Sequence, residues 1–223
     1  MCHTVYMRLY AVITPPPAVL HHLRSAVDEA RAHTPEVPWT EPSMWSLMLA
    51  RFGNLGLEET TVVRDTLGAI GTYCPPLRLQ LTGALATPED SHEVESLGVG
   101  MTGDLAELLS LATAVPAMVQ RHGMFLDRRS FQAVIPLAQA AQGLFPPARA
   151  LAALQTYQGP TWTSTEMRLV RLIPRSDDQP GLGEYEDIAR FDFTAEPEPD
   201  AESVADSEAD SEAESYATAH RAP

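Results

Sequence analysis

Three of the side chains in this sequence that suit proton transfer and anion binding lie just before one apolar segment. His122 precedes that segment, and Arg128 and Arg129 adjoin it. Histidine can take up or release a proton near neutral pH, and the arginine guanidinium can hold two phosphate oxygens at once. These residues suggest an acid–base group beside an anion contact. The simpler interpretation is a solvated side chain in each case, because a lone histidine is little evidence of a site.

The other reactive residue types do not form a recognisable site. Cys2 and Cys74 are the only cysteines, and neither has the spacing of a metal ligand. The glycines do not match the spacing of phosphate-binding loops. Ser46 is a possible nucleophile, but no base lies beside it in the sequence, and a partly buried strand serine is the commoner case. We therefore expect no metal and no cofactor.

Strand and helix patterns alternate along the chain and predict an α+β domain. A short apolar run before a proline cluster, and the alternation of leucines with polar residues near residue 80, are typical of strands. Three stretches carry apolar residues at helical spacing. We expect strands at 7–13, 44–52, 77–82, 96–101, 131–137, 163–173 and 184–193, and helices at 17–34, 58–70, 104–116 and 147–156.

The helix that starts near residue 104 carries the clearest end signals. Asp104 followed by Glu107 resembles a capping box, in which each side chain accepts a hydrogen bond from a free backbone N–H. Leu105, Leu108 and Leu109, with later apolar residues, are expected to form its buried face. Pro116 is expected to interrupt it, because proline lacks the N–H that a helix interior needs.

Charge and composition divide the chain into two parts. The net charge is −15, and the segment 194–223 holds nine acidic residues, one arginine and few large apolar residues. We expect residues 1–193 to form the folded domain and residues 194–223 an acidic disordered tail. The domain keeps 21 acidic residues against 14 arginines, so an extended nucleic-acid surface is not expected. No secretory signal or long apolar run is present, which predicts a cytoplasmic protein without a membrane span.

Two segments resemble the flanks of a known pair of catalytic motifs. They are Pro38–Gly53, which reads PWTEPSMWSLMLARFG, and Asp127–Ala138, which reads DRRSFQAVIPLA. Both are similar to the surroundings of the two His-x-Thr motifs of the 2H phosphoesterases, the family of the 2'-5' RNA ligase and RNA 2',3'-cyclic phosphodiesterase proteins. Further segments that resemble the family's strands follow in the same order as in the family, and together they span most of residues 6–193.

The resemblance implies a fold of two pseudo-equivalent lobes, with antiparallel sheets and flanking helices around a central cleft. It also implies that two histidines transfer protons while two threonines hold phosphate oxygens. This chain has Ser46 and Met48 at the first motif, and Val134 and Pro136 at the second. None of these side chains transfers a proton near neutral pH. Proline also cannot donate to a sheet, so Pro136 predicts an edge strand or a bulge.

The resemblance therefore predicts a 2H phosphoesterase-like protein that has lost its usual catalysis, with a cleft that takes a small nucleotide, an RNA end or a partner. Whether the chain is an enzyme stays open, although the missing groups argue against it. One alternative is an active phosphodiesterase on 2',3'-cyclic or 2'-5'-linked nucleotides with relocated catalytic groups, such as His122 and Arg128. Another is an interaction protein that binds a partner through its acidic tail.

Overall fold

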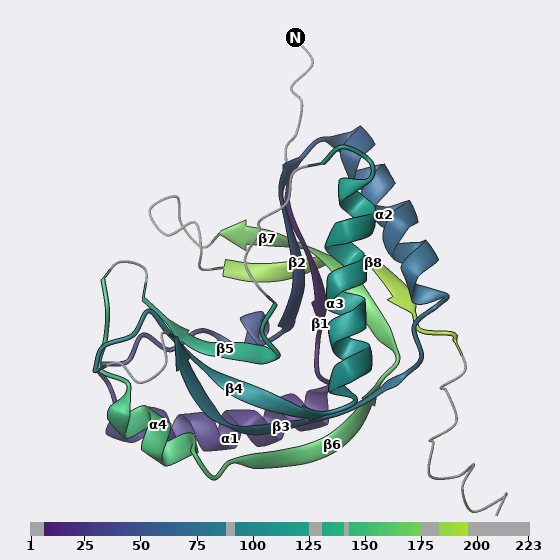
Figure 1. Cartoon of the computed structure of the whole chain (residues 1–223). Coiled ribbons are helices and arrows are strands. Elements are labelled where there is room, and N and C mark those ends of the chain that lie inside the picture. Colours follow the sequence, from purple (N-terminus) through teal and green to yellow (C-terminus); the bar gives the residue numbers. More distant parts are fainter. Residues whose placement is uncertain (1–6, 88–91, 125–130, 141–142, 175–182, 196–223) are drawn as a thin grey trace, which may run out of the picture.

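The computed structural model describes residues 7–87, 92–124, 131–140, 143–174 and 183–195. Within these residues the chain builds two four-stranded antiparallel sheets with helices packed around them (Figure 1). The predicted fold class, α+β with two antiparallel sheets and flanking helices, is confirmed. Arg128, Arg129 and the predicted tail beyond residue 195 lie outside the described residues.

The first sheet, called sheet A, holds the beginning and the end of the folded chain. Its strands lie in the order β2-β1-β7-β8. They are β1 (Met7–Ile13), β2 (Leu47–Leu55), β7 (Glu166–Pro174) and β8 (Gly183–Asp192).

The second sheet, called sheet B, is built from the middle of the chain. Its strands lie in the order β5-β4-β3-β6. They are β3 (Leu77–Thr87), β4 (Ser96–Gly103), β5 (Val134–Gln139) and β6 (Gln158–Ser164). The prediction for Pro136 is confirmed, because β5 is an edge strand and its register with β4 shifts opposite this residue.

In the described part of the chain, four α-helices and one 3-10 turn flank the sheets. Helices α2 and α3 pack on each other, and they contact β8 and β2, respectively (Figure 1). Helices α1 and α4 also pack on each other, with α1 against β6 and α4 against β3. They are α1 (Pro17–His33), η1 (Pro42–Met44), α2 (Leu57–Gly71), α3 (Leu105–Gln120) and α4 (Ala148–Leu154).

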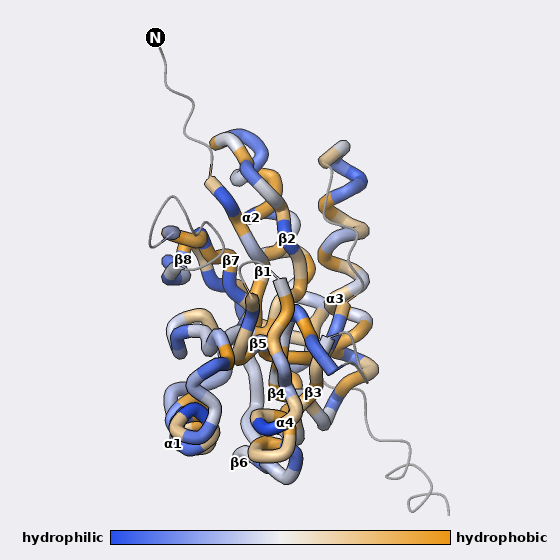
Figure 2. Tube along the Cα trace, turned by 90° about the vertical axis from the view of Figure 1, so that its left-hand side faces the viewer, coloured by the Kyte–Doolittle hydropathy of each residue, from blue (hydrophilic) through white to orange (hydrophobic). Residues whose placement is uncertain are grey.

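Alternation along the strands decides which side chains enter the core. On β1, Leu9, Ala11 and Ile13 are fully buried, whereas Tyr10 between them is half-buried. Successive strand residues point to opposite faces, so Tyr10 lies on the other face of sheet A from these three. Apolar residues, drawn in orange, run along the strands at the centre of the molecule (Figure 2).

The two sheets are connected directly at Thr165. The sequence pattern predicts one strand over 163–173, but β6 ends at Ser164 in sheet B and β7 begins at Glu166 in sheet A. That prediction is wrong because the apolar–polar alternation continues across the junction and hides it. The carbonyl of Thr165 accepts a hydrogen bond from the N–H of Phe193 at 2.8 Å, which fixes the junction to the end of β8.

Helix α3 differs from its prediction in two respects. Pro116 does not interrupt it, because the helix continues to Gln120 and buries Val115 and Val119 on either side of the proline. Leu105 and Leu109 are exposed rather than buried, at 39% and 55% of their surface. The packing of the inward residues outweighs the hydrogen bond that proline removes.

Asp104 stands at the N-cap position of this helix, and its carbonyl accepts a hydrogen bond from the N–H of Leu108 at 3.0 Å. Its side chain makes no capping hydrogen bond, so the predicted capping box is wrong. Its carboxylate Oδ2 accepts a hydrogen bond from the backbone N–H of Arg78 at 2.7 Å. The N–H of Asp104 in turn donates to the carbonyl of Arg78 at 3.0 Å. The Asp104 side chain therefore fastens the end of β4 to the beginning of β3 instead of capping the helix.

Changing Asp104 to alanine should lower the free energy of unfolding by about 1 kcal/mol, because the N–H of Arg78 loses its side-chain acceptor. Asp104→Asn should recover most of that loss, since its amide oxygen can accept the same hydrogen bond. Urea unfolding measures both. Equal stability of the alanine variant and the parent protein would contradict this role for Asp104.

None of the helices in the described part of the chain combines the length and the apolarity that a membrane span requires.

Candidate functional site

The first motif positions lie where the chain enters β2. Ser46 directly precedes β2 and is only 4% exposed, and its hydroxyl shares a hydrogen bond with the Thr14 hydroxyl at 2.9 Å. Met48 is half-buried and lies opposite Val12 of β1. Because the Ser46 hydroxyl meets another hydroxyl and not a base among the described residues, nothing there activates it as a nucleophile.

The second motif positions lie on β5. Val134 and Pro136 are both half-buried, and they lie opposite Gly100 and Gly98 of β4. The Val134 Cγ1 methyl lies where a Cβ on Gly98 would stand. This valine therefore packs flat on the sheet and offers a ligand only apolar surface.

A short hydrogen-bonded segment holds the two motif strands together. The Thr40 N–H donates to the carbonyl of Leu137 in β5 at 2.8 Å, and its hydroxyl donates to the same carbonyl at 3.0 Å. The indole N–H of Trp45 donates to the Thr40 hydroxyl at 3.1 Å. Strands β2 and β5 lie in contact. The residues just before the first motif are thus bonded to the second.

The tryptophans pack in or against the hydrophobic core. Trp45 and Trp162 are 1% and 7% exposed, and the half-buried Trp39 packs against the same core. Trp45 in particular belongs to the link between the motif strands.

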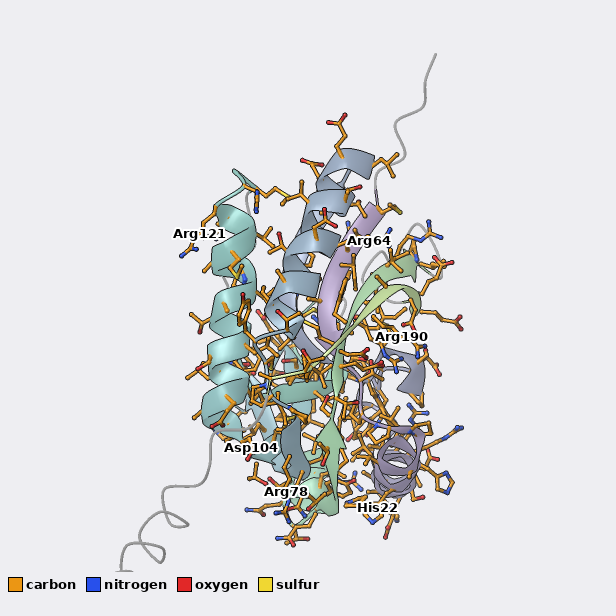
Figure 3. The ribbon with its side chains drawn as sticks, turned by 90° about the vertical axis from the view of Figure 1, so that its right-hand side faces the viewer. His22, Arg64, Arg78, Asp104, Arg121 and Arg190 are labelled. Atoms are coloured by element: carbon orange, nitrogen blue, oxygen red, sulfur yellow. The ribbon has the colours of Figure 1, made fainter. Side chains whose placement is uncertain are left out.

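His122 is placed in the turn after α3. Its side chain is exposed, and its backbone N–H donates to the carbonyl of Val119 at 3.1 Å. Figure 3 shows its neighbour Arg121 at the opposite end of α3 from Asp104. The structure gives the imidazole no hydrogen-bond partner among the described residues, so no second group orients the ring there.

A pocket of about 480 Å³ opens beside Val134 on sheet B. None of its lining residues is ionisable, although glutamine and threonine side chains stand among them. Its volume is within the range of small-ligand sites. Such a lining suits an uncharged group with hydrogen-bonding edges. The lining residues are Thr82, Gly83, Ala84, Leu85, Ala86, Thr87, Gly100, Met101, Gln132, Ala133, Val134 and Gln155.

Tyr10, Arg51 and Tyr185 form a polar cluster on sheet A. The rings of Tyr10 and Tyr185 lie 5.8 Å apart, and Arg51 is the cross-strand partner of Tyr10. Burial, with a smaller contribution from Tyr10, raises the pKa of Tyr185 to about 12, and Arg51 opposes that rise. Burial also raises the pKa of Tyr10, against the opposing charges of Arg8 and Arg51. Both phenols are therefore protonated at neutral pH.

The single described cysteine is not a candidate nucleophile. Cys74 is buried, and burial raises the pKa of its thiol to about 11. The reactive thiolate is therefore scarce at neutral pH. Among the described residues, no three or more His, Cys, Asp or Glu side chains gather into a group that could hold a metal ion.

Solved structures resemble this chain over most of its length. TT0787 of Thermus thermophilus is similar with a TM-score of 0.66 and 18% identity, covering 86% of this chain and 100% of that one. E. coli LigT, a 2'-5' RNA ligase solved in complex with 3'-AMP, is similar with a TM-score of 0.63 and 20% identity, covering 85% and 99%. These neighbours are 2H phosphoesterases. This chain has the 2H phosphoesterase fold. No protein-family model and no curated protein sequence matches it.

A third structure, of a phosphoesterase, is similar with a TM-score of 0.65 and 21% identity, covering 85% of this chain and 99% of that one. The resemblance read from the motif flanks is confirmed at the level of fold. The sequence-based reasoning placed the motif segments on strands, but it missed the polar cluster on sheet A. No local sequence signal could have found it, because strand order and register bring its residues together.

Proposed function

We propose that this protein binds a small nucleotide on the 2H phosphoesterase fold without hydrolysing it. One observation carries the proposal. The four positions matched to the two His-x-Thr motifs hold a hydroxymethyl, a thioether, an isopropyl group and a proline ring, at Ser46, Met48, Val134 and Pro136.

The chemistry of phosphodiester cleavage explains why this substitution matters. One group must take a proton from the attacking oxygen, and another must give a proton to the leaving oxygen. Each such group contributes about 10²–10⁴-fold to the rate. The Ser46 hydroxyl has no base beside it among the described residues, and Val134 has no titratable atom. Met48 and Pro136 cannot donate a side-chain hydrogen bond to a phosphate oxygen.

Two observations support a nucleotide as the ligand. LigT has been solved in complexes with 3'-AMP, ATP, NADP+ and phosphate. In this chain, the pocket beside Val134 is lined by uncharged residues that include Gln132 and Gln155. Glutamine amides both donate and accept hydrogen bonds, as the edges of a nucleobase require.

The test combines a turnover assay with a binding assay on the full chain. We expect the protein to bind 3'-AMP in calorimetry, and to open 2',3'-cyclic AMP at least about 10²-fold more slowly than LigT measured alongside, because proton-transfer groups are missing. Chromatography of the products measures the rate. The same assay on 2'-5'-linked and 3'-5'-linked oligonucleotides covers the other phosphodiesters.

The alternative of an active phosphodiesterase makes the opposite prediction. Rapid turnover that His122→Ala abolishes would overturn our proposal and assign His122 a relocated catalytic role. Turnover that persists unchanged in both His122→Ala and Ser46→Ala would point to a contaminating enzyme, which a second purification step would remove.

A further inference from the structure

We propose that Arg51, Tyr10 and Tyr185 form an oxyanion-binding site on sheet A. The register of the sheet brings the three residues together from β2, β1 and β8. Arg51 is the antiparallel partner of Tyr10, so the two side chains leave the same face of the sheet. The Tyr185 ring lies 5.8 Å from the Tyr10 ring and is tilted by 58° to it, which places the second phenol on that face as well.

The surroundings of Arg51 differ from those of the other arginines on this sheet. Arg168 pairs with Glu166 at 2.7 Å and Asp187 at 3.5 Å. Arg190 pairs with Asp187 at 2.7 Å, and Arg171 pairs with Glu186. Arg51 is half-buried, and within the described ranges it has neither a hydrogen bond nor an acidic partner. A partly buried cation without an acidic partner favours an anion from solution.

The two tyrosines complete a set of hydrogen-bond donors. Their pKa values are raised by burial, so both keep the phenolic proton at neutral pH. Arg8, two residues before Tyr10 on the same strand, makes a side-chain hydrogen bond to Tyr10. Because arginine can only donate, the Tyr10 oxygen accepts that bond and its own proton remains available. A guanidinium and two phenolic O–H groups on one face suit the oxygens of a phosphate group.

The cluster adjoins the first motif position. Met48 lies opposite Val12, and Arg51 lies opposite Tyr10, two residues earlier on β1. Residues two apart on a strand share a face and are separated by roughly 7 Å. The first motif of the 2H family, as the resemblance implies, places a phosphate-holding threonine where this chain has Met48. The anion contact in this chain would therefore lie one step along the same face of the sheet.

The oxyanion site can exist without the proposed function, but its assignment to the phosphate of a nucleotide rests on that function. The experiment is calorimetry on the full chain with inorganic phosphate and, separately, 3'-AMP. Arg51→Gln should weaken the binding of both at least 10-fold, and Tyr185→Phe should weaken it about 3-fold. The matched control is Arg64→Gln, which removes the same charge from the exposed face of α2 (Figure 3) and should leave both affinities unchanged. Thermal melts verify that each variant is folded.

The outcomes separate the two proposals. Phosphate binding that Arg51→Gln weakens and Arg64→Gln does not would support the oxyanion site, even if 3'-AMP fails to bind and the proposed function falls. Binding of 3'-AMP that is unchanged in Arg51→Gln would overturn the oxyanion site and leave the proposed function standing. A parent protein that binds neither ligand would overturn both.

If Arg51→Gln melts early, Arg51→Lys takes its place. It keeps the charge without the bidentate geometry, so unchanged phosphate affinity in a folded Arg51→Lys variant would also count against the site.

Discussion

Trp45→Ala should lower the free energy of unfolding by about 3–5 kcal/mol, which is the usual cost of removing a fully buried aromatic side chain. Trp45 is 1% exposed, so the substitution leaves a cavity in the core. It also removes the indole N–H that donates to the Thr40 hydroxyl at 3.1 Å. Because Thr40 is bonded to β5, the loss reaches the contact between the two motif strands. Urea unfolding followed by circular dichroism measures the change.

Trp45→Phe separates packing from hydrogen bonding. The phenyl ring fills much of the indole space but has no N–H, so the expected loss is smaller, about 1–2 kcal/mol. A loss below about 1 kcal/mol for Trp45→Ala would show that this region can collapse around the cavity, and that Trp45 does not hold the strands together.

Gly98→Ala should lower the free energy of unfolding by about 2–3 kcal/mol through overpacking. A Cβ at this position would overlap the Val134 Cγ1 methyl and stand 2.7 Å from the carbonyl oxygen of Ile135. Both neighbours belong to β5, so the edge strand would have to move away from β4. Thermal or urea unfolding measures the effect. The matched control is Gly68→Ala in α2, where a Cβ meets only Phe191 at 3.7 Å and stability should stay equal or rise by up to about 1 kcal/mol.

A double-mutant cycle identifies the contact responsible. Removing the Val134 methyl groups as well, in Gly98→Ala/Val134→Ala, should restore about 1 kcal/mol relative to the sum of the two single changes. Strict additivity would mean that the backbone of Ile135, and not Val134, resists the new side chain. The cycle thus tests whether Val134 is held at the second motif position by its fit to Gly98.

Much of the fold follows from local pattern. The apolar run at β1, the spacing in α1 and α2, and the alternation in β3 each predict the correct element, because the buried face of each repeats within a few residues. The errors at Asp104 and Pro116 have a common cause, since in both cases a tertiary contact outweighs a local preference. The side chain of Asp104 bonds to β3 rather than to its own helix, and α3 continues past Pro116.

The candidate site, like the fold, follows only in part from the local sequence. The motif flanks predict which strands matter, and the proline at position 136 correctly predicts an edge strand. The polar cluster could not be predicted because its residues come from three distant strands, with Tyr185 more than a hundred residues after Tyr10 and Arg51. Their proximity depends on strand order and on the two register shifts between β1 and β2, and neither leaves a mark in the local sequence.

The connections between the two sheets affect how a ligand would bind. A single residue, Thr165, separates β6 of sheet B from β7 of sheet A, and elsewhere Thr40 is bonded across to β5. Domain closure needs a hinge of several residues that can absorb a change of backbone angles. With one tether that short and another made of hydrogen bonds, the sheets have little freedom to swing. Association would then resemble docking onto a preformed surface, with little ordering entropy lost on binding.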